Sequence, residues 1–331
     1  MRVVEISEPG DADVLRVVER PTPGPGINEV LVAVEASGVS RADVAQRKGN
    51  YPPPPAHSDI PGLEVAGTIA AVGANVRGWH VGDRVCALVN GGGYAEFAIA
   101  PAPQVLIVPK HWTTIEAASL PENAFTVYDA LFARARLQRR ETVLVHGGTS
   151  GIGTTAIMFA KALEARVIVT AGSQTKCAAA RDLGADLAID YKTADFVEEV
   201  RRFTGGAGVD VVLDMVGGAY IARDLDALAL DGRIVCIATL GGSKTELDIA
   251  ALMRRRGTIA GSSLRPRTVE QKGAIAKALR ERIWPLLPKR NPIVPVIDST
   301  FTFEQAAQAH QRMESSAHIG KIVLTPRPAS P

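Results

Sequence analysis

The sequence predicts an α/β protein with two domains, a compact β-barrel followed by a doubly wound parallel sheet. Three observations lead to this prediction. The chain has 331 residues, enough for two separate hydrophobic cores. Up to about Glu122 it consists of short strand-like runs separated by glycine and proline, a pattern typical of a barrel. From about Asn123 strand-like and helical segments alternate, as in a parallel sheet with helices on both faces.

The strands of the barrel part are marked by alternation and by turns. Glu29–Ala36 has the alternating pattern of a strand, and Val65–Val72 is a second apolar run. Gly82–Val85 and Gly91–Phe97 each read as a glycine turn that leads into a further strand. The four prolines of Pro52–Pro55 exclude helix there and predict an extended loop.

The second part alternates between two kinds of segment, which predicts a parallel sheet. The strand-like runs are Val143–Val145, Val167–Thr170, Leu187–Ile189, Val209–Leu213, Arg233–Ala238 and Thr258–Ser262. The helical stretches among them include Thr154–Leu163, Lys176–Leu183 and Asp195–Phe203.

The chain after about Arg267 contains a long helix around Gln271–Leu287, a proline-rich link, a helix at Glu304–Met313 and a strand at Gly320–Leu324. We expect this tail to return to the first domain. The first domain then comprises residues 1–123 and 268–331, and the second comprises residues 124–267.

The composition excludes several classes of protein. The 37 basic and 35 acidic side chains nearly cancel, which argues against a nucleic-acid binder or a binder of anionic membranes. No apolar run approaches the roughly 20 residues needed to cross a bilayer, and the amino terminus lacks the apolar core of a signal peptide. Cys86, Cys177 and Cys236 form no Cys-x-x-Cys pair, which argues against a disulfide framework or a structural zinc lobe. We therefore expect a cytoplasmic protein.

The most informative stretch is Val143–Gly153, which reads Val-Leu-Val-His-Gly-Gly-Thr-Ser-Gly-Ile-Gly. A strand that turns at glycines into a helix presents backbone N–H groups and the positive end of the helix to a ligand. The alternative is a glycine-rich loop without a ligand. Because the flanking strand and helix are both predicted, this stretch favours a site for a nucleotide diphosphate.

The residues after the second strand of this domain indicate which nucleotide binds. In dinucleotide-binding folds an acidic residue there contacts the ribose hydroxyls and disfavours a 2′-phosphate. This chain has no carboxylate at that point, but it has Ser173 and Lys176, a hydroxyl and an ammonium suited to a phosphate. Alternatively, Ser173 only caps the helix that begins near Gln174, and Lys176 is solvated. We favour NADPH over NADH, with Tyr191 as a weaker candidate for a contact with the adenosine.

Seven segments together resemble the medium-chain dehydrogenase/reductase superfamily, and most closely its quinone oxidoreductase (zeta-crystallin-like) branch. They are Gly38–Asp43, Gly49–Pro54, Pro61–Gly67, Val81–Val85, Thr170–Ser173, Leu230–Arg233 and Ile319–Val323. The combination is most similar to the stress-induced NADPH:quinone reductase subgroup. The resemblance implies a GroES-like β-barrel catalytic domain and a Rossmann domain with a doubly wound parallel sheet.

This chain differs from two related classes of dehydrogenase at residues that determine the reaction. The zinc alcohol dehydrogenases have a cysteine where this chain has Ser40 and a histidine where it has Leu63, so we expect no metal. Without a Lewis acid, reduction of an electrophilic quinone or activated alkene is favoured over alcohol oxidation. The short-chain reductases carry a similar turn and a Tyr-x-x-x-Lys motif, but none of the five tyrosines here has a lysine four residues later.

The resemblance also implies which residues bind NADPH between the two domains. Those for the diphosphate are Gly148, Ser150, Gly151 and Gly153, and those for the adenosine end are Gly172, Ser173, Lys176 and Tyr191. Those for the nicotinamide half are Thr126, near its ribose, and Leu240, Gly241, Leu264 and Arg265. Alternatively, Arg265 or Arg267 is a plain surface charge.

Ser40, Asp43 and Tyr51 are the polar residues that the resemblance places on the acceptor side. Tyr51 is suited to donate a hydrogen bond to a quinone carbonyl or to gate its entry. Alternatively, Tyr51 packs on Pro52–Pro55, and Asp43 caps the start of a helix. A reduced quinone can take its proton from water, so no essential acid is required.

The favoured function is NADPH-dependent reduction of quinones. The alternative is reduction of α,β-unsaturated carbonyls, as in an enoyl or alkenal reductase, and a third possibility is a non-catalytic NADPH-binding protein. An additional RNA-binding role is disfavoured by the near-neutral charge. The expected partners are a small quinone or enone and a second copy of the chain, paired through the edge strand Thr258–Ser262. We expect no nucleic-acid or membrane partner.

Overall fold

The computed structural model describes residues 1–55, 57–286 and 294–327. The chain divides into two compact units, each described here by itself. Unit 1 consists of Met1–Phe125, Arg265–Pro285 and Val294–Pro331, and unit 2 of Thr126–Leu264 and Leu286–Ile293. No helix within the described ranges is long and apolar enough to cross a membrane.

Unit 1 is built on a sheet with seven described strands in the order β14-β15-β3-β4-β5-β7, in which β6 also pairs with β3. The strands are β3 (Glu29–Val39), β4 (Glu64–Val72), β5 (Arg84–Leu88), β6 (Phe97–Pro101), β7 (Val105–Ile107), β14 (Ile297–Thr302) and β15 (Lys321–Thr325). A separate hairpin is formed by β1 (Arg2–Ile6) and β2 (Leu15–Glu19). Val30, Val32 and Val34 of β3 share one buried face because side chains alternate along a strand. The strands expected in this part of the chain are confirmed.

The carboxy-terminal tail returns to unit 1, as expected. β15 pairs antiparallel with β3, where Ile322 lies opposite Val39, and β14 pairs parallel with β15. The helix α10 (Ala306–Glu314) follows one 3₁₀ turn at Phe303–Gln305. The helix expected at Gln271–Leu287 differs: α9 (Val269–Ala278) gives way to a wider π-helical turn at Leu279–Ile283 and a 3₁₀ turn at Trp284–Leu286. Pro285 cannot donate a helical hydrogen bond, and Leu287 lies outside the described residues.

The other described helical segments of unit 1, and the one that leads into unit 2, are short. In unit 1 and at its boundary they are the α-helices α1 (Arg41–Arg47), α2 (Thr114–Ala118) and α3 (Pro121–Val127), and the 3₁₀ turns Ala12–Val14 and Ala102–Gln104. In unit 2 a π-helical segment, Tyr128–Arg134, follows α3 directly.

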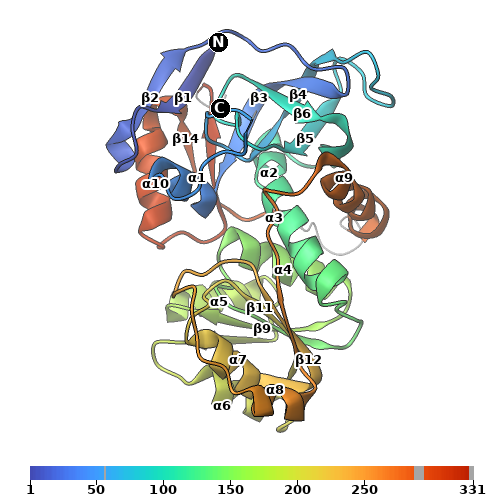
Figure 1. Ribbon diagram of the computed structural model, residues 1–331, viewed down its shortest axis with the longest axis vertical. Helices are drawn as coiled ribbons and strands as arrows, with labels where there is room; N and C mark the ends of the chain where they lie inside the picture. Colours follow the sequence, from blue (N-terminus) through green and yellow to red (C-terminus); the bar gives the residue numbers. More distant parts are fainter. Residues whose placement is uncertain (56, 287–293, 328–331) are drawn as a thin grey trace. The chain divides into compact units, whose positions relative to one another are not determined.

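Unit 2 is a doubly wound parallel sheet flanked by helices (Figure 1). Its strand order is β10-β9-β8-β11-β12-β13. The strands are β8 (Thr142–Val145), β9 (Arg166–Ala171), β10 (Leu187–Asp190), β11 (Val209–Asp214), β12 (Leu228–Cys236) and β13 (Thr258–Gly261). The helices are α4 (Gly151–Ala162), α5 (Gln174–Asp182), α6 (Phe196–Phe203), α7 (Tyr220–Ala227) and α8 (Ile249–Arg255). All six expected strands are present. From β8 the chain first builds the sheet on one side, through β9 and β10, and then returns to the other side of β8 with β11. The strand order therefore reverses between β8 and β11. In sheets of this kind ligands bind at that point.

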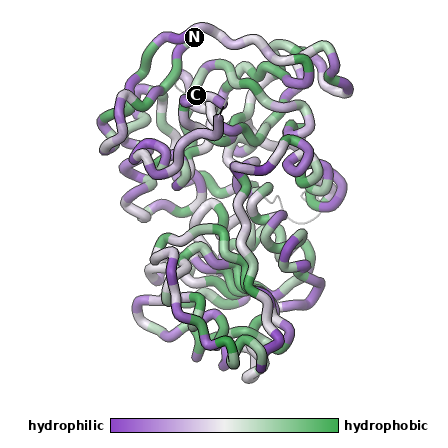
Figure 2. The backbone as a smooth tube through the Cα atoms, in the orientation of Figure 1, coloured by the Kyte–Doolittle hydropathy of each residue, from purple (hydrophilic) through white to green (hydrophobic). Residues whose placement is uncertain are grey.

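Alternating side chains give each face of this sheet its own cover. Leu144, Ile168 and Val212 occupy one register row. They lie in a hydrophobic cluster with Phe196 of α6 and Ile221 of α7. The side chains next to these residues along each strand point to the opposite face of the sheet, where α4 packs against β8 and β9. In Figure 2 the central strands of this unit are mostly green, and the purple segments lie in the helices and loops around them.

A buried ion pair ties the tail of the chain to the sheet of unit 1. The Lys321 Nζ lies 2.6 Å from the Glu64 Oε1, and both side chains are almost fully buried. The backbone N–H of Glu122 donates to the other oxygen of Glu64 at 2.8 Å. Burial lowers the pKa of Lys321, but the attraction of Glu64 outweighs it and leaves that pKa above its usual value. Gly38 leaves the room for this pair, since a Cβ there would lie 2.0 Å from the carboxylate.

Replacing Lys321 by methionine should therefore destabilise unit 1. The change leaves a buried carboxylate without its counter-charge, which costs about 3–5 kcal/mol in unfolding free energy. Urea denaturation of the wild type and the variant measures the difference. The double variant Glu64→Gln/Lys321→Met should recover most of the loss, and a single-variant loss below about 1 kcal/mol would contradict the assignment.

Candidate functional site

The glycine turn of unit 2 joins β8 directly to α4. The Ser150 Oγ caps this helix by accepting a hydrogen bond from the Gly153 N–H at 3.0 Å. A Cβ at Gly153 would lie 2.3 Å from the carbonyl oxygen of Gly147, and a Cβ at Gly148 would lie 2.4 Å from the side chain of Val169. The turn is therefore too tight for side chains at these positions. Such a turn at the start of a helix fits a diphosphate, which needs close approach to backbone N–H groups.

The residues expected at the adenosine end meet at the carboxyl ends of β9 and β10. Ser173 is the cap of α5, and its hydroxyl accepts a hydrogen bond from the Lys176 N–H at 3.3 Å. The capping role of Ser173 is thus confirmed, and the hydroxyl still has a hydrogen to donate to a phosphate. Tyr191 lies against Gly172, where a Cβ would be 2.8 Å from its hydroxyl oxygen. Lys176 is half-buried in this corner rather than fully solvated.

One carboxylate near this corner did not stand out in the sequence. Asp190 ends β10, one strand beyond the position where an acidic residue selects NADH. Its side chain accepts a hydrogen bond from the Lys192 N–H at 3.1 Å and another from the Gln174 side chain at 3.5 Å. Asp190 therefore closes the turn that follows its own strand.

Residues expected at the nicotinamide half lie on three segments. Leu240 and Gly241 are exposed, and their N–H groups donate to the carbonyls of Met215 and Val216 after β11. Met215 also touches the glycine turn, since a Cβ at Gly147 would lie 2.9 Å from its sulfur. Met215 thus connects two expected parts of the cofactor site within unit 2, a contact that no local sequence pattern revealed.

Thr126 and Leu264 lie at the two ends of the main segment of unit 2. Both are half-buried. Thr126 belongs to α3, and Leu264 follows β13. Their expected contact with the nicotinamide half stays a prediction.

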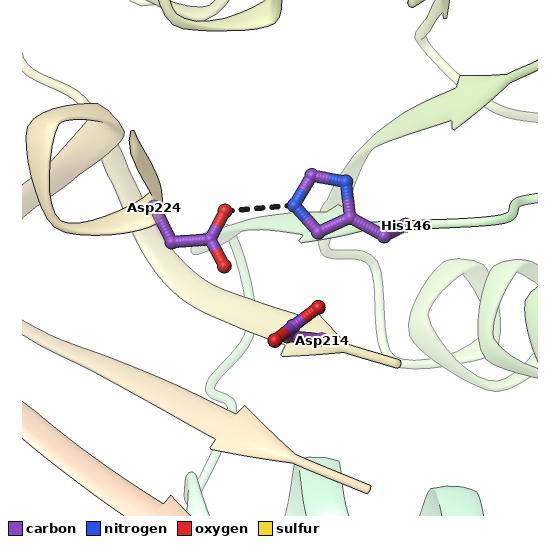
Figure 3. Close-up of side chains that lie close together, drawn as sticks. All are labelled: His146, Asp214 and Asp224. Atoms are coloured by element: carbon purple, nitrogen blue, oxygen red, sulfur yellow. Dashed lines mark hydrogen bonds and ion pairs between the residues drawn. The ribbon is translucent and has the colours of Figure 1, made fainter. Parts of the chain in front are cut away.

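Behind the glycine turn lies a buried cluster of polar residues that the sequence analysis did not single out (Figure 3). The His146 ring bonds to the Thr170 Oγ1 at 3.0 Å through Nδ1 and to the Asp224 Oδ1 at 2.7 Å through Nε2. The Thr170 hydroxyl also accepts a hydrogen bond from the Gly147 N–H at 3.4 Å. His146 therefore anchors the start of the glycine turn to β9 and α7.

Asp214 completes this cluster, and its candidate ligand atoms lie within 4.8 Å of those of His146 and Asp224. Asp214 accepts hydrogen bonds from the N–H groups of Val216 and Gly217. A metal ion would have to displace the His146–Asp224 hydrogen bond. The arrangement therefore supports a structural network better than a metal centre. The feature of the sequence that could have revealed this cluster is a polar residue at the end of each of two buried strands, His146 after β8 and Asp214 at the end of β11.

In unit 1, Ser40 and Asp43 form a capping box at the start of α1. The Asp43 carboxylate is fully buried and accepts hydrogen bonds from the N–H and hydroxyl of Ser40, from the Gly62 N–H and from the Tyr94 hydroxyl, at 2.7 to 3.2 Å. Burial raises the pKa of Asp43, and the hydrogen bonds from Ser40 and Gly62 act in the opposite direction. Asp43 lies in the first turn of this helix, but the capping residue is Ser40; Asp43 is the third helical residue, and its carboxylate bonds back to the Ser40 N–H. Contact of either residue with an acceptor stays a prediction.

A chain of buried side chains continues from Asp43 toward α10. The Tyr94 hydroxyl bonds to the His310 Nε2 at 3.1 Å, and the Arg47 guanidinium lies 3.5 Å from the His310 Nδ1. Burial and the charge of Arg47 lower the pKa of His310 to about 3, so the ring is neutral. Arg47 donates to Nδ1, the Nε2–H then donates to Tyr94, and Tyr94 donates to Asp43. Because a guanidinium does not release its proton, this chain stabilises Asp43 and does not carry protons.

Tyr51 is held by Arg265, which lies far away in the sequence. The Arg265 guanidinium carbon lies 4.7 Å from the centre of the Tyr51 ring, and one guanidinium N–H donates to the Tyr51 carbonyl at 2.9 Å. The other end of the guanidinium donates to the Gln46 Oε1 at 2.7 Å. Arg265 is 6% exposed, so its alternative role as a plain surface charge is wrong. Burial raises the pKa of Tyr51 against the opposing effect of Arg265, so its hydroxyl keeps its proton at neutral pH.

Residues 26–110 match the family model "Alcohol dehydrogenase GroES-like domain", and residues 151–280 match "Zinc-binding dehydrogenase". The quinone oxidoreductase of Rattus norvegicus is 33% identical over 98% of this chain and 97% of its own length. The structure of Escherichia coli quinone oxidoreductase complexed with NADPH has a TM-score of 0.84 and 30% identity, over 98% of this chain and 100% of that one. The structure of the CurK enoyl reductase has a TM-score of 0.86 and 28% identity, over 98% of each chain.

Unit 1 thus matches a GroES-like domain, and unit 2 has the Rossmann-type parallel sheet of nicotinamide-dependent enzymes. Both matches agree with the predicted fold class. The chain therefore belongs to the quinone oxidoreductase family of the medium-chain dehydrogenases/reductases, and it is an oxidoreductase that works with a nicotinamide cofactor.

Proposed function

We propose that this protein reduces quinones with NADPH and without a metal. The observation that carries the proposal is the full-length similarity to quinone oxidoreductases, combined with the residues that replace zinc ligands. Leu63 offers a buried hydrocarbon side chain, and the hydroxyl of Ser40 is engaged with Asp43. Neither residue is suited to bind zinc, although one matching family model is named for that metal.

The preference for NADPH rests on the corner formed by Gly172, Ser173, Lys176 and Tyr191. Ser173 supplies a hydroxyl and Lys176 a positive charge beside the end of β9, where no carboxylate is present. A 2′-phosphate at the start of α5 also gains from the N–H groups of the first helical turn. Asp190, whose carboxylate bonds within its own turn, does not remove this advantage.

The cofactor supplies a hydride when it is bound. The chain contributes the binding of the diphosphate at the glycine turn, the phosphate contacts of Ser173 and Lys176, and a hydrogen bond from Tyr51 to the acceptor oxygen. Ser40, Asp43 and Tyr94 bond to one another, so we assign the final proton to water. Positioning and electrostatics then account for the rate.

A second candidate function is the reduction of α,β-unsaturated carbonyls. The similarity to an enoyl reductase structure favours it, because the same hydride donor serves both acceptors. The third possibility, a protein that binds NADPH without catalysis, is decided by the same measurement.

We expect NADPH consumption to be faster with 1,2-naphthoquinone than with a 2-alkenal, because a quinone needs no acid or metal to accept a hydride. Steady-state absorbance measurements give kcat/KM for both acceptors. Dialysis against a chelator should leave the rate unchanged. A higher kcat/KM for the alkenal would replace the proposal by the second function, and tight NADPH binding with turnover of neither acceptor would leave the third.

Replacing Lys176 by glutamate should weaken NADPH binding by about 10- to 100-fold, since a charged hydrogen bond of about 1.5–3 kcal/mol is lost. NADH binding should change far less. Fluorescence titration gives both dissociation constants. Lys110→Glu, an exposed lysine of unit 1, makes the same charge change away from the corner. An equal loss of affinity for NADPH and NADH would contradict the assignment of Lys176 to the 2′-phosphate.

We also propose a homodimer that pairs through β13 and α8. β13 is an edge strand of the sheet of unit 2, and α8 buries none of its residues. Ile249 and Met253 of this helix are 58% and 71% exposed. An apolar surface beside a strand edge is usually covered by a partner.

Light scattering should therefore give a mass of about twice the 35.0 kDa of one chain. The double variant Ile249→Lys/Met253→Glu should shift the mass to that of a monomer, because it places charges on the proposed contact. Ile27→Lys, which alters an exposed isoleucine of unit 1, serves as the control. A wild-type protein with the mass of one chain would exclude the dimer.

A further inference from the structure

Unit 1 contains two buried cations whose hydrogen-bond acceptors are all neutral. Lys272 is 1% exposed, and its Nζ donates to the Asn90 Oδ1 at 2.6 Å and to the Arg265 carbonyl at 2.9 Å. Arg265 donates to the carbonyls of Tyr51 and Asn90 and to the amide oxygen of Gln46. Neither cation forms an ion pair with any residue that the structure describes.

Two other buried cations of the same unit show what is unusual here. Arg47 has the carboxylate of Glu314 at 3.0 Å, and Lys321 has that of Glu64 at 2.6 Å. Buried charges are normally paired because their desolvation is costly. Burial, followed by repulsion from Arg265 and Arg267, lowers the pKa of Lys272 to about 8. The fold therefore retains two neighbouring positive charges that weaken it, which is a common property of functional sites.

The positive charge lies next to Tyr51. Arg265 stacks on the Tyr51 ring, and Lys272 bonds to the backbone of Arg265. Asp43 is the acidic group that acts on Arg265 electrostatically, and its carboxylate already accepts hydrogen bonds from Ser40, Gly62 and Tyr94. Arg265 is the cation that acts electrostatically on the phenol of Tyr51, where Glu122 and Asp43 act in the opposite direction.

We propose that Arg265 and Lys272 are positioning residues that hold Tyr51 and stabilise the negative charge formed on the acceptor oxygen during reduction. This inference rests on the proposed function. The acceptor gains the hydride, its π-electron pair moves onto a carbonyl oxygen, the nicotinamide is oxidised, and the oxygen then takes a proton from water. Tyr51 is the group that touches the oxygen, and the two cations act through it and through their field.

The charge of Lys272 makes this inference testable by pH. Arg265 and Arg267, which precede α9, act on Lys272 electrostatically. The turn that follows α9 and packs against it carries Arg280, Glu281 and Arg282. The packed turn Ala102–Gln104 carries no titratable side chain. As pH rises through about 8, Lys272 loses its charge, so kcat/KM for the quinone should fall.

The key variants are Lys272→Met and Lys272→Arg. Lys272→Met should lower kcat/KM for 1,2-naphthoquinone at least 10-fold at pH 7 and remove its decline near pH 8. Lys272→Arg should keep the activity and extend it to higher pH, because arginine stays charged. The dissociation constant of NADPH should change less than 2-fold. Lys277→Met, on the exposed side of the same helix, should leave all of these unchanged.

Thermal stability provides a second readout. If Lys272 had only a structural role, its replacement would lower the Tm, whereas the proposed role predicts an equal or higher Tm. Between about pH 8 and the usual lysine pKa the unfolded chain binds more protons than the folded one, so wild-type stability should rise with pH in that window. Lys272→Met should lack this rise, and its Tm at pH 7 should equal or exceed that of the wild type.

The outcomes separate this inference from the proposed function. A wild-type protein that turns over no quinone would overturn the proposed function. An active wild type whose rate and pH profile are unaffected by Lys272→Met would overturn the inference alone. So would a Lys272→Met variant whose lost activity is accompanied by a lower Tm.

Discussion

Unit 2 depends on a contact that leaves no room for side chains, between the first turn of α4 and the turn that follows β8. A Cβ at Gly153 would lie 2.3 Å from the Gly147 oxygen, so the helix can begin this close to the strand only with glycine there. His146 supports the contact from behind through Thr170 and Asp224. Gly147 of the same turn contacts Met215, whose carbonyl accepts a hydrogen bond from the Leu240 N–H.

Buried cations have two different environments in unit 1. The Glu64–Lys321 pair and the Arg47–Glu314 pair join the carboxy-terminal tail to the first part of the chain. In these pairs the desolvation cost is offset by opposite charge. Arg265 and Lys272 form no such pair with any described residue. Arg265 lies on the ring of the tyrosine expected to meet the acceptor, and Lys272 bonds to the Arg265 carbonyl. This contrast within one unit is the basis for proposing a functional role for Arg265 and Lys272.

Local patterns predicted the strands well and the irregular elements less well. The apolar runs at Val143 and Val209 lie in strands because a central parallel strand is apolar on both faces. The strand expected from Arg233 in fact begins at Leu228, with an irregular register near Asp231, whose φ is +60°. Asp-Gly is locally a turn signal. The pairing with β11 passes from Leu228 directly to Arg233, so the turn residues form an irregularity within the strand. The helix expected at Gln271–Leu287 likewise changes type near Pro285.

The sequence by itself determined the fold class, the family and the glycine turn, because these depend on residue type and spacing along the chain. It also pointed to Ser173 and Lys176, which are only three residues apart at the start of one helix. Only the tertiary structure decided the surroundings of Asp43, Tyr51 and Arg265. Asp43 meets Tyr94 and the chain that leads to His310, and Tyr51 meets an arginine 214 residues away. Such contacts arise from packing between segments that are distant in the sequence. Burial also strengthens the electrostatic effect of a charge on its neighbours, because less water screens it.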